Sequence, residues 1–396
     1  MKLIRPLAFW LLAVASAVIT LNLAAADIDS PREHLSLDAN WRFHLGDDWP
    51  NALNLAKAGE SRGPAAEKFN DTAWRTLDLP HDWAIELPFD KMSDTSHGFK
   101  PVGPNYPKNS IGWYRRTFEL PKDDAGKRIW LTFDGVFRDA TVWVNGWLVK
   151  RHEGGYYPFR EDITDIAHFG GKNTVTVKVD ASKFEGWFYE GAGIYRHVWL
   201  DKTAPVAIAP DGIFVRSSFS NNIPEGDSAI YAEVLINNSL PTNANPAVQC
   251  ELISPENKPI AHTLVHIIQT GPNSVASWVA YFCLLHNDVN PENIQGVGVV
   301  SDQPELWSPE SPKLYKLKTT VQLDGKIVDQ KETLFGIRTF AFDPTNGFLL
   351  NGKHYELNGT CNHQDMAGVG AALPDALQYF RVAKLKEFGC NAYRTS

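Results

Sequence analysis

The stretch RIWLTFDGVFRDATVWVNGWLVKRHEGGYYPF, residues 128–159, consists of short apolar runs separated by turn-forming residues. Its segments TVWV (141–144) and WLVKR (147–151) flank the pair Asn145-Gly146. Asn and Gly tolerate the positive φ angles of a type I′ turn, so this pair is a strong signal for a β-hairpin. The stretch therefore predicts antiparallel β-structure.

The sequence on both sides of this hairpin, from residue 27 to about residue 205, has the same character. The segment NTVTVKVD (173–180) alternates Val with Thr and Lys, which predicts a strand with buried Val side chains and a solvent-facing opposite side. A region of this length built from short strands favours a jelly-roll β-sandwich over residues 27–205. Within it, LPHDW (79–83) predicts a structural turn, because its His-Asp pair has no nucleophile motif to serve.

A second β-region covers residues 206–340. The segments AIYAEVLINNS (229–239) and YKLKTTVQLDGKIVDQKETLFGIRTF (315–340) again alternate apolar and polar residues, and Asp324-Gly325 supplies a hairpin turn. Several short strands in a region of this size predict an immunoglobulin-like β-sandwich.

The pattern changes in residues 341–396. A hairpin around Asn351-Gly352 is followed by a strand, the loop QDMAGVGAALPD (364–375), a helix that ends near Gly389 and the strand CNAYRT (390–395). This order predicts a βαβ unit with parallel strands. A (β/α)8 barrel needs about 250 residues. We therefore expect a mainly β fold in which residues 341–396 are the truncated start of a barrel, with apolar helix residues left partly exposed.

The first 26 residues predict a secretory signal. Lys2 and Arg5 precede the apolar run LAFWLLAVASAVIT (7–20), and Ala24 and Ala26 provide a small-residue cleavage site. Cleavage would give a secreted or periplasmic protein that is not held in the membrane. The alternative is an anchor retained at the N-terminus.

The composition narrows the class of partner. The net charge of the 396-residue chain is −8 and becomes −10 when the signal and its two basic residues are removed. An acidic chain without a basic cluster is a poor nucleic-acid binder. Small neutral molecules or carbohydrates fit better, and the oligomeric state, including a homo-oligomer, stays open.

The four cysteines include no CxxC pair, so we expect no metal site and no cofactor. Cys250 and Cys283 could form a disulfide in an oxidising compartment. Alternatively all four are buried thiols, which we favour for Cys361 and Cys390.

Six motifs in order resemble glycoside hydrolase family 2, which contains β-galactosidases, β-glucuronidases and β-mannosidases. The motifs are GWYRRTFELP (112–121), DGVFRDATVWVNG (134–146), GAGIYRHVWL (191–200), LWSPESPKLY (306–315), GIRTF (336–340) and LNGKHYELNGTCNHQD (350–365) with LKEFGCNAYRTS (385–396). The resemblance implies a jelly-roll domain, an immunoglobulin-like domain and a catalytic barrel. It also implies a retaining exo-glycosidase that acts on terminal β-linked sugars. Among these, galactosides are favoured by GFKPVGPNYPKNSIGWYRR (98–116) and NHQD (362–365).

Members of this family place two catalytic glutamates on later barrel strands, and no residue of this chain matches either one. Neither Glu356 nor Glu387 is assigned to that role. By resemblance, His363 hydrogen-bonds a sugar hydroxyl, and Arg394 lies close to the nucleophilic carboxylate. We expect this chain alone to be inactive.

Three further residues are candidates for sugar contact. Asp365 could accept hydrogen bonds from sugar hydroxyls or could cap its own loop. The resemblance implies that Asn105 and Glu185 reach from the first domain to the barrel mouth.

Four aromatic residues near these candidates fit the core better than a sugar-stacking surface: Tyr156, Tyr157, Trp187 and Phe188. The alternative for the whole chain is a non-catalytic carbohydrate-binding protein, or a relative specific for β-glucuronides or β-mannosides.

Overall fold

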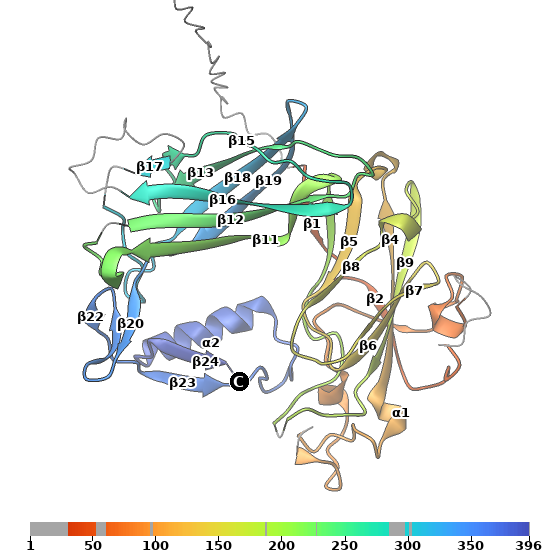
Figure 1. Ribbon diagram of the computed structural model, residues 1–396. Helices are drawn as coiled ribbons and strands as arrows, with labels where there is room; N and C mark the ends of the chain where they lie inside the picture. The colour runs from red at the N-terminus through yellow and green to blue at the C-terminus, as the bar shows by residue number, and fades with distance from the viewer. Residues whose placement is uncertain are drawn as a thin grey trace, which may run out of the picture.

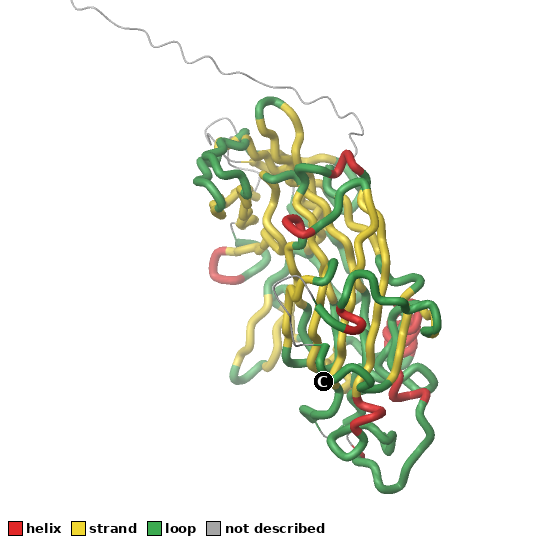
Figure 2. Tube along the Cα trace, turned by 90° about the vertical axis from the view of Figure 1, so that its right-hand side faces the viewer, coloured by secondary structure: helices red, strands yellow, loops and turns green. Residues whose placement is uncertain are grey.

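The computed structural model describes residues 31–52, 61–95, 98–186, 188–226, 228–284, 298–300 and 303–395. The predicted signal peptide and Trp187 lie outside these residues. Two β-sandwiches stand at an angle to each other, and the segment from residue 340 onward lies in the angle between them (Figure 1). Strands and the loops between them dominate the chain trace, and the helices are few and short (Figure 2). The predicted mainly β, β-sandwich class is confirmed.

The first sandwich consists of two antiparallel sheets. One sheet has the order β1-β10-β5-β8 and the other β3-β2-β4-β9-β6-β7. Between β4 and β10 the chain passes repeatedly from one sheet to the other, so the sheets are held together by many connections. Their bounds are β1 Glu33–Ser36, β2 Trp41–Leu45, β3 Arg75–Leu77, β4 Ile111–Leu120, β5 Arg128–Phe133, β6 Asp139–Val144, β7 Trp147–His152, β8 Phe159–Asp162, β9 Gly171–Asp180 and β10 Val198–Thr203. The four-residue helix α1, Pro107–Ser110, precedes β4.

The hairpin predicted at Asn145-Gly146 joins β6 to β7, and both residues have positive φ, as the type I′ turn requires. In β9, Val175, Val177 and Val179 are buried as predicted. The prediction of a solvent-facing opposite side is wrong at Thr176, which is also buried. The reason is that a second, smaller core of tryptophans and alanines covers the outer face of this sheet.

The second sandwich packs a sheet of order β11-β12-β16-β17 against a sheet in which β14, β13, β18 and β19 are neighbours and β15 also pairs with β13. The bounds are β11 Val206–Phe219, β12 Ser228–Asn238, β13 Ala247–Ile253, β14 Pro259–His262, β15 His266–Ile267, β16 Ser274–Leu284, β17 Gly298–Val300, β18 Tyr315–Leu323 and β19 Lys326–Phe335. Asp324-Gly325 forms the predicted turn between β18 and β19, again with positive φ at both residues.

The C-terminal segment, residues 340–395, contains a three-stranded antiparallel sheet, a helix and a parallel strand pair. The sheet is β20 Phe340–Asp343, β21 Gly347–Leu350 and β22 Lys353–His354, with Asn351-Gly352 as the predicted turn. β23 (Gly359–Asn362) and β24 (Ala392–Thr395) pair in parallel, and α2 (Asp375–Glu387) connects them. The predicted βαβ unit is therefore present.

The helix α2 contains no buried residue, and Phe388 just beyond it is 86% exposed. Partial exposure of the apolar helix residues was expected from the sequence. Within the described residues, no helix combines the length and apolarity that crossing a bilayer requires.

The cysteine predictions need correction. None of the four cysteines forms a disulfide, and all four lie among the described residues. Cys250 is buried on β13, whereas Cys283 lies on β16 in the facing sheet, so the two belong to opposite layers of the second sandwich. The prediction that Cys361 and Cys390 are buried is also wrong. Cys361 is exposed on β23, where its thiol contacts the exposed Arg394, and Cys390 is half-buried in the connection before β24.

Candidate functional site

The parallel pairing of β23 and β24 brings several polar residues to one edge. Asn362 pairs with Thr395 at the end of both strands, and His363 follows immediately. Carboxyl ends of parallel strands are where β/α folds collect their functional side chains. The loop of residues 363–373 then leads to α2 and completes this edge, which we call the rim.

The guanidinium of Arg381 on α2 fixes the backbone of the rim. It donates hydrogen bonds to the carbonyl oxygens of His363 (2.7 Å) and Asp365 (2.6 Å). Two charge-assisted hydrogen bonds from one planar group hold the backbone of these two loop residues in a fixed position relative to α2. The predicted site residues His363 and Asp365 are thus positioned by a helical arginine that sequence reasoning had not singled out.

The first sandwich contributes an aromatic wall to the rim. The ring of His363 meets the ring of Phe188 edge-on, with centroids 4.9 Å apart. Gln364 donates from Nε2 to the carbonyl oxygen of Tyr189 at 3.1 Å. The loop before the GAGIYR motif therefore reaches the rim, although through Phe188 and not through Glu185.

Two polar atoms of the rim are buried without a hydrogen-bond partner among the described residues: Nδ1 of His363 and Oε1 of Gln364. Buried polar groups are normally satisfied, so such atoms in one loop point to a ligand or water that completes the site. A cavity of about 390 Å³ adjoins these residues and extends between α2, β24 and the first sandwich.

Arg394 lies on the opposite face of the strand pair. Its neighbours Tyr393 and Thr395 line the cavity beside α2, whereas Arg394 donates from a terminal guanidinium nitrogen to Sγ of Cys361 at 3.1 Å. Alternation along β24 therefore directs Arg394 away from the helix. The structure does not place it in the same cavity as His363.

Two predicted residues of the first sandwich occupy other surroundings. Glu185 forms an ion pair with Arg138, with Oε1 2.8 Å from a terminal guanidinium nitrogen. Asn105 is exposed and lines a separate cavity of about 250 Å³ together with Phe184. Neither residue is brought into contact with His363 by the interactions described above.

A buried glutamate that sequence reasoning missed organises the loop before GAGIYR. Oε1 of Glu190 accepts hydrogen bonds from the backbone N–H groups of Glu185 (2.8 Å) and Gly186 (2.7 Å) and from the hydroxyl of Tyr156 (3.0 Å). Burial raises the pKa of Glu190, and these hydrogen bonds only partly offset that effect. Glu190 could have been noticed from the sequence, because it is a charged residue among aromatic and small residues and therefore a candidate for a buried structural role.

The aromatic predictions for this region were partly wrong. Tyr156 is 40% exposed and Tyr157 is 54% exposed, so neither is a core residue. Both lie in the connection between β7 and β8, where their hydroxyl groups donate to Glu190 and to the carbonyl oxygen of Glu153, respectively, which keeps these polar ends near the surface. Phe188 is half-buried, and its ring packs on His363.

The LPHDW turn joins the rim to the first sandwich, in keeping with a structural role. The carboxylate of Asp82 is fully buried and accepts hydrogen bonds from the hydroxyl of Tyr189 (2.7 Å) and from the backbone N–H groups of Ala84, Ala192 and Ala371. Burial raises the pKa of Asp82, and the four hydrogen bonds oppose that shift. The rim therefore has a fixed position on the sandwich.

Comparison with known proteins gives two family matches. Residues 35–204 match the model of the sugar binding domain of glycosyl hydrolases family 2, and residues 207–338 match the model of glycosyl hydrolases family 2 itself. The matched ranges correspond closely to the two sandwiches.

Individual relatives agree with this result. Beta-galactosidase BoGH2A of Bacteroides ovatus is 35% identical over 376 residues, 94% of this chain and 39% of that protein. A beta-glucuronidase of Formosa agariphila is 30% identical over 350 residues, 82% of this chain and 33% of that protein.

The crystal structure of a glycosyl hydrolase family 2 member from Bacteroides cellulosilyticus superposes with a TM-score of 0.77 at 28% identity, covering 92% of this chain and 43% of that one. This chain thus spans less than half the length of each of these three relatives. From the two matched domains and the shared fold, we conclude that the chain belongs to glycosyl hydrolase family 2.

Proposed function

We propose that this chain is the N-terminal portion of an exported retaining exo-glycosidase that hydrolyses terminal β-linked sugars, with β-galactosides as the preferred substrates. Family membership supports glycoside hydrolysis, and the greater length of the relatives supports a larger enzyme. The β-galactosidase of B. ovatus supports galactose over glucuronic acid, since it is more similar to this chain than the F. agariphila enzyme described above.

In this proposal the first sandwich is a jelly roll, the second is immunoglobulin-like, and β23-α2-β24 begins a (β/α)8 barrel. In such barrels the helices lie outside and strand residues facing away from them point into the barrel. Arg394, which faces away from α2, would then point inward, where it can hold a nucleophilic carboxylate ionised.

Retaining hydrolysis needs two carboxyl groups about 5–5.5 Å apart, one kept protonated as the acid and one ionised as the nucleophile. We assign neither role to a residue of this chain. What the chain supplies is substrate positioning: His363 at the rim to hydrogen-bond a sugar hydroxyl, and Asp365 to accept from another.

The observation that carries the proposal is the way His363 is held. Arg381 fixes its backbone, Phe188 fixes its ring, and Nδ1 is buried without a partner among the described residues. An orphaned ring nitrogen in a fixed ring is suited to a sugar hydroxyl that arrives with the substrate.

The experiment compares the 396-residue chain with the polypeptide obtained by reading the same gene beyond Ser396. We expect no measurable hydrolysis of an aryl β-galactoside by the former and clear turnover by the latter, with aryl β-glucuronides cleaved less well. In the longer polypeptide, His363→Ala should lower kcat/KM roughly 100-fold or more. His354→Ala, at an exposed position on β22, is the matched control and should have no effect. Turnover by the 396-residue chain alone would contradict the proposal.

A further inference from the structure

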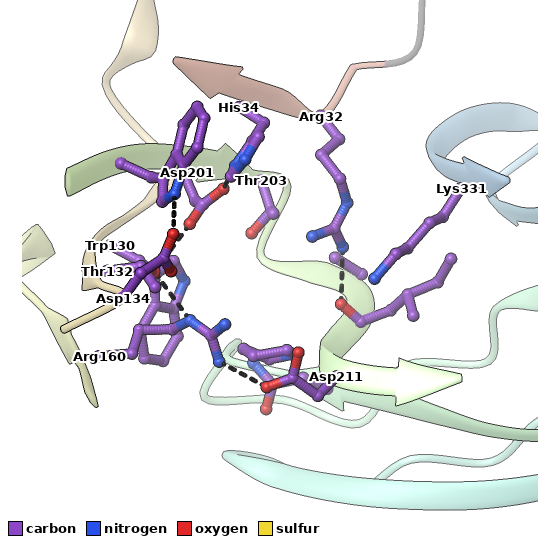
Figure 3. Close-up of a pocket in the computed structure, with 15 residues that line it drawn as sticks. Arg32, His34, Trp130, Thr132, Asp134, Arg160, Asp201, Thr203, Asp211 and Lys331 are labelled. Carbon is purple, nitrogen blue, oxygen red and sulfur yellow. Dashed lines mark hydrogen bonds and ion pairs between the residues drawn. The ribbon is translucent and has the colours of Figure 1, made fainter. Parts of the chain in front are cut away.

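A second cavity, larger than the one beside the rim, lies on the outer face of the sheet β1-β10-β5-β8, where this sheet meets the second sandwich (Figure 3). Its volume is about 520 Å³. Pockets that bind small molecules in proteins span roughly 300–1,000 Å³. The cavity is therefore large enough for one or two sugar rings.

The floor of the cavity is an outward-facing set of strand residues. On β10, Leu200 points into the core, whereas Trp199 and Asp201 point outward; on β5, Leu131 points inward and Trp130 outward. In the strand register Asp201 lies directly opposite Trp130. Indole rings therefore lie beside carboxylates on adjacent strands. A sheet face that was simply exposed to water would not need large aromatic side chains there.

Hydrogen bonds hold the polar groups of the floor in place. Arg160 donates to Oγ1 of Thr132 at 3.0 Å and pairs with Asp211 at 3.2 Å. The same threonine donates to Asp201 at 2.9 Å. Figure 3 shows Arg160 and Asp211 pointing toward each other at one side of the cavity, with Asp201 and His34 on another. The groups are therefore arranged before any ligand arrives, which lowers the entropic cost of binding.

The wall on the side of the second sandwich is also rigid. Arg32 makes a two-pronged ion pair with the buried carboxylate of Asp329, with nitrogen–oxygen distances of 3.0 and 2.7 Å, and donates to the carbonyl oxygen of Ile208 at 2.7 Å. The backbone N–H of Ile208 donates to the same carboxylate at 2.7 Å. This network fastens the corner between the two sandwiches, so the cavity keeps its shape.

The charges that line the cavity balance. Three bases (Arg32, Arg160 and Lys331) and three acids (Asp134, Asp201 and Asp211) line it, and the ring of His34, which also lines it, hydrogen-bonds Asp201. A site for an anion or a cation would carry an excess of the opposite charge. Alternating planar donors and acceptors beside an indole instead suit a neutral ligand with many hydroxyl groups and an apolar ring face.

We propose that this cavity is a binding site for a neutral saccharide of one or two rings, with Trp130 packing against a ring face and with Arg160 and Asp201 hydrogen-bonding hydroxyl groups. The site is built entirely from residues of this chain and does not depend on the proposed hydrolysis. A reaction product, a branch of the substrate and the end of a polysaccharide would all present the same groups to this cavity, namely a neutral sugar ring with its hydroxyl groups.

The test is titration of the 396-residue chain with lactose and with glucuronic acid, followed by NMR or calorimetry. We expect saturable binding of lactose and none of glucuronic acid. Trp130→Ala and Arg160→Met should each weaken lactose binding by roughly tenfold or more. Trp147→Ala is the matched control, because Trp147 is 42% exposed on β7 in the other sheet; it should bind as the unaltered chain does. Circular dichroism should show the same fold for all variants.

Three outcomes would overturn the proposal: no saturable lactose binding, equal weakening by Trp147→Ala, or binding by the 396-residue chain that disappears in the longer polypeptide. The last result would mean that protein fills the cavity. Failure of the proposed hydrolysis would leave lactose binding by this chain unchanged, so the two proposals fail separately.

Discussion

The carboxylate of Asp82 accepts a hydrogen bond of 2.9 Å from the backbone N–H of Ala371, a residue 289 positions later in the chain. The same carboxylate oxygen accepts from the hydroxyl of Tyr189. One buried side chain therefore connects three parts of the protein: the first sandwich, the loop that precedes the GAGIYR motif, and the rim. This contact could not be predicted from the sequence, because neither the LPHDW segment nor the rim loop contains a pattern that indicates which distant residue it contacts.

Replacing Asp82 by Asn should destabilise the protein. The amide retains one acceptor oxygen and places an NH2 group against N–H donors, so at least one backbone N–H loses its partner in a buried site. We expect a loss of roughly 2–4 kcal/mol in the free energy of unfolding. Urea denaturation followed by circular dichroism measures it.

Asp165→Asn is the control for this change, because the side chain of Asp165 is 92% exposed. It should alter the free energy of unfolding by less than about 0.5 kcal/mol. Equal stability of the Asp82 and Asp165 variants would show that the buried carboxylate does not secure the rim.

A pair of glycines in the rim loop tests the same contact from the other side. Gly370 has φ +61° and a Cβ built there would overlap Oδ2 of Asp82, whereas Gly368 has φ +90° and open space around its Cβ position. Gly368→Ala should cost only the strain of positive φ, roughly 1–2 kcal/mol. Gly370→Ala should cost that strain plus roughly 1–3 kcal/mol for the collision.

Thermal denaturation and limited proteolysis of the two variants distinguish these costs. We expect Gly370→Ala to release the C-terminal segment to protease more readily than Gly368→Ala. Indistinguishable variants would mean that the loop moves away from Asp82 at no cost.

The sequence predicted those parts of the fold that are determined locally. Asn145-Gly146, Asp324-Gly325 and Asn351-Gly352 were recognised because positive φ favours those residue types within the turn itself. The βαβ unit was recognised from its strand, loop and helix order. Alternation in β9 predicted the buried valines but not the burial of Thr176, because its cover comes from tryptophans on other strands.

The candidate site was less accessible to sequence reasoning. His363 and Asp365 could be named from the resemblance, but the side chains that hold them, Arg381 and Phe188, come from a helix and from a distant loop. Such contacts depend on the packing of whole elements against each other. The same reason explains why Glu190 was missed, since its hydroxyl partner, Tyr156, lies 34 residues earlier in the chain.

His81 should make the protein less stable in mild acid. Burial lowers the pKa of His81 to about 4, an effect that its contact with Glu86 opposes and Arg75 reinforces. Between about pH 6.5 and 4 the unfolded chain binds a proton that the folded chain excludes, so stability falls as the pH falls through this window. The shift corresponds to about 3 kcal/mol.

Urea denaturation at pH 7 and pH 4.5 measures this effect. His81→Gln cannot titrate, so its stability should change less between the two pH values than that of the unaltered protein. His354→Gln, at an exposed position, should keep the full pH dependence. A His81→Gln variant with undiminished pH dependence would show that other groups cause it.

His197 should act in the opposite direction on the C-terminal segment. Its Nδ1 lies 2.7 Å from Asp38 in the first sandwich and its Nε2 lies 3.2 Å from Asp375 at the start of α2. Burial lowers the pKa of His197, but the hydrogen bonds and charges of the two aspartates outweigh it, and the net shift is upward. The contribution is therefore fully present below the unfolded pKa of about 6.5 and is lost as the pH rises through the folded value.

We expect trypsin to cut within α2, at Lys384 and Lys386, faster at pH 8.5 than at pH 6.5 after correction for the pH dependence of the protease on an unfolded peptide. The difference should be roughly two- to fivefold, because Asp375 is 75% exposed and such pairs contribute at most about 1 kcal/mol. His197→Gln should remove the difference, and Asp375→Asn should reduce it. A corrected cleavage rate that is the same at both pH values in the unaltered protein would mean that protonated His197 does not hold α2 against the first sandwich.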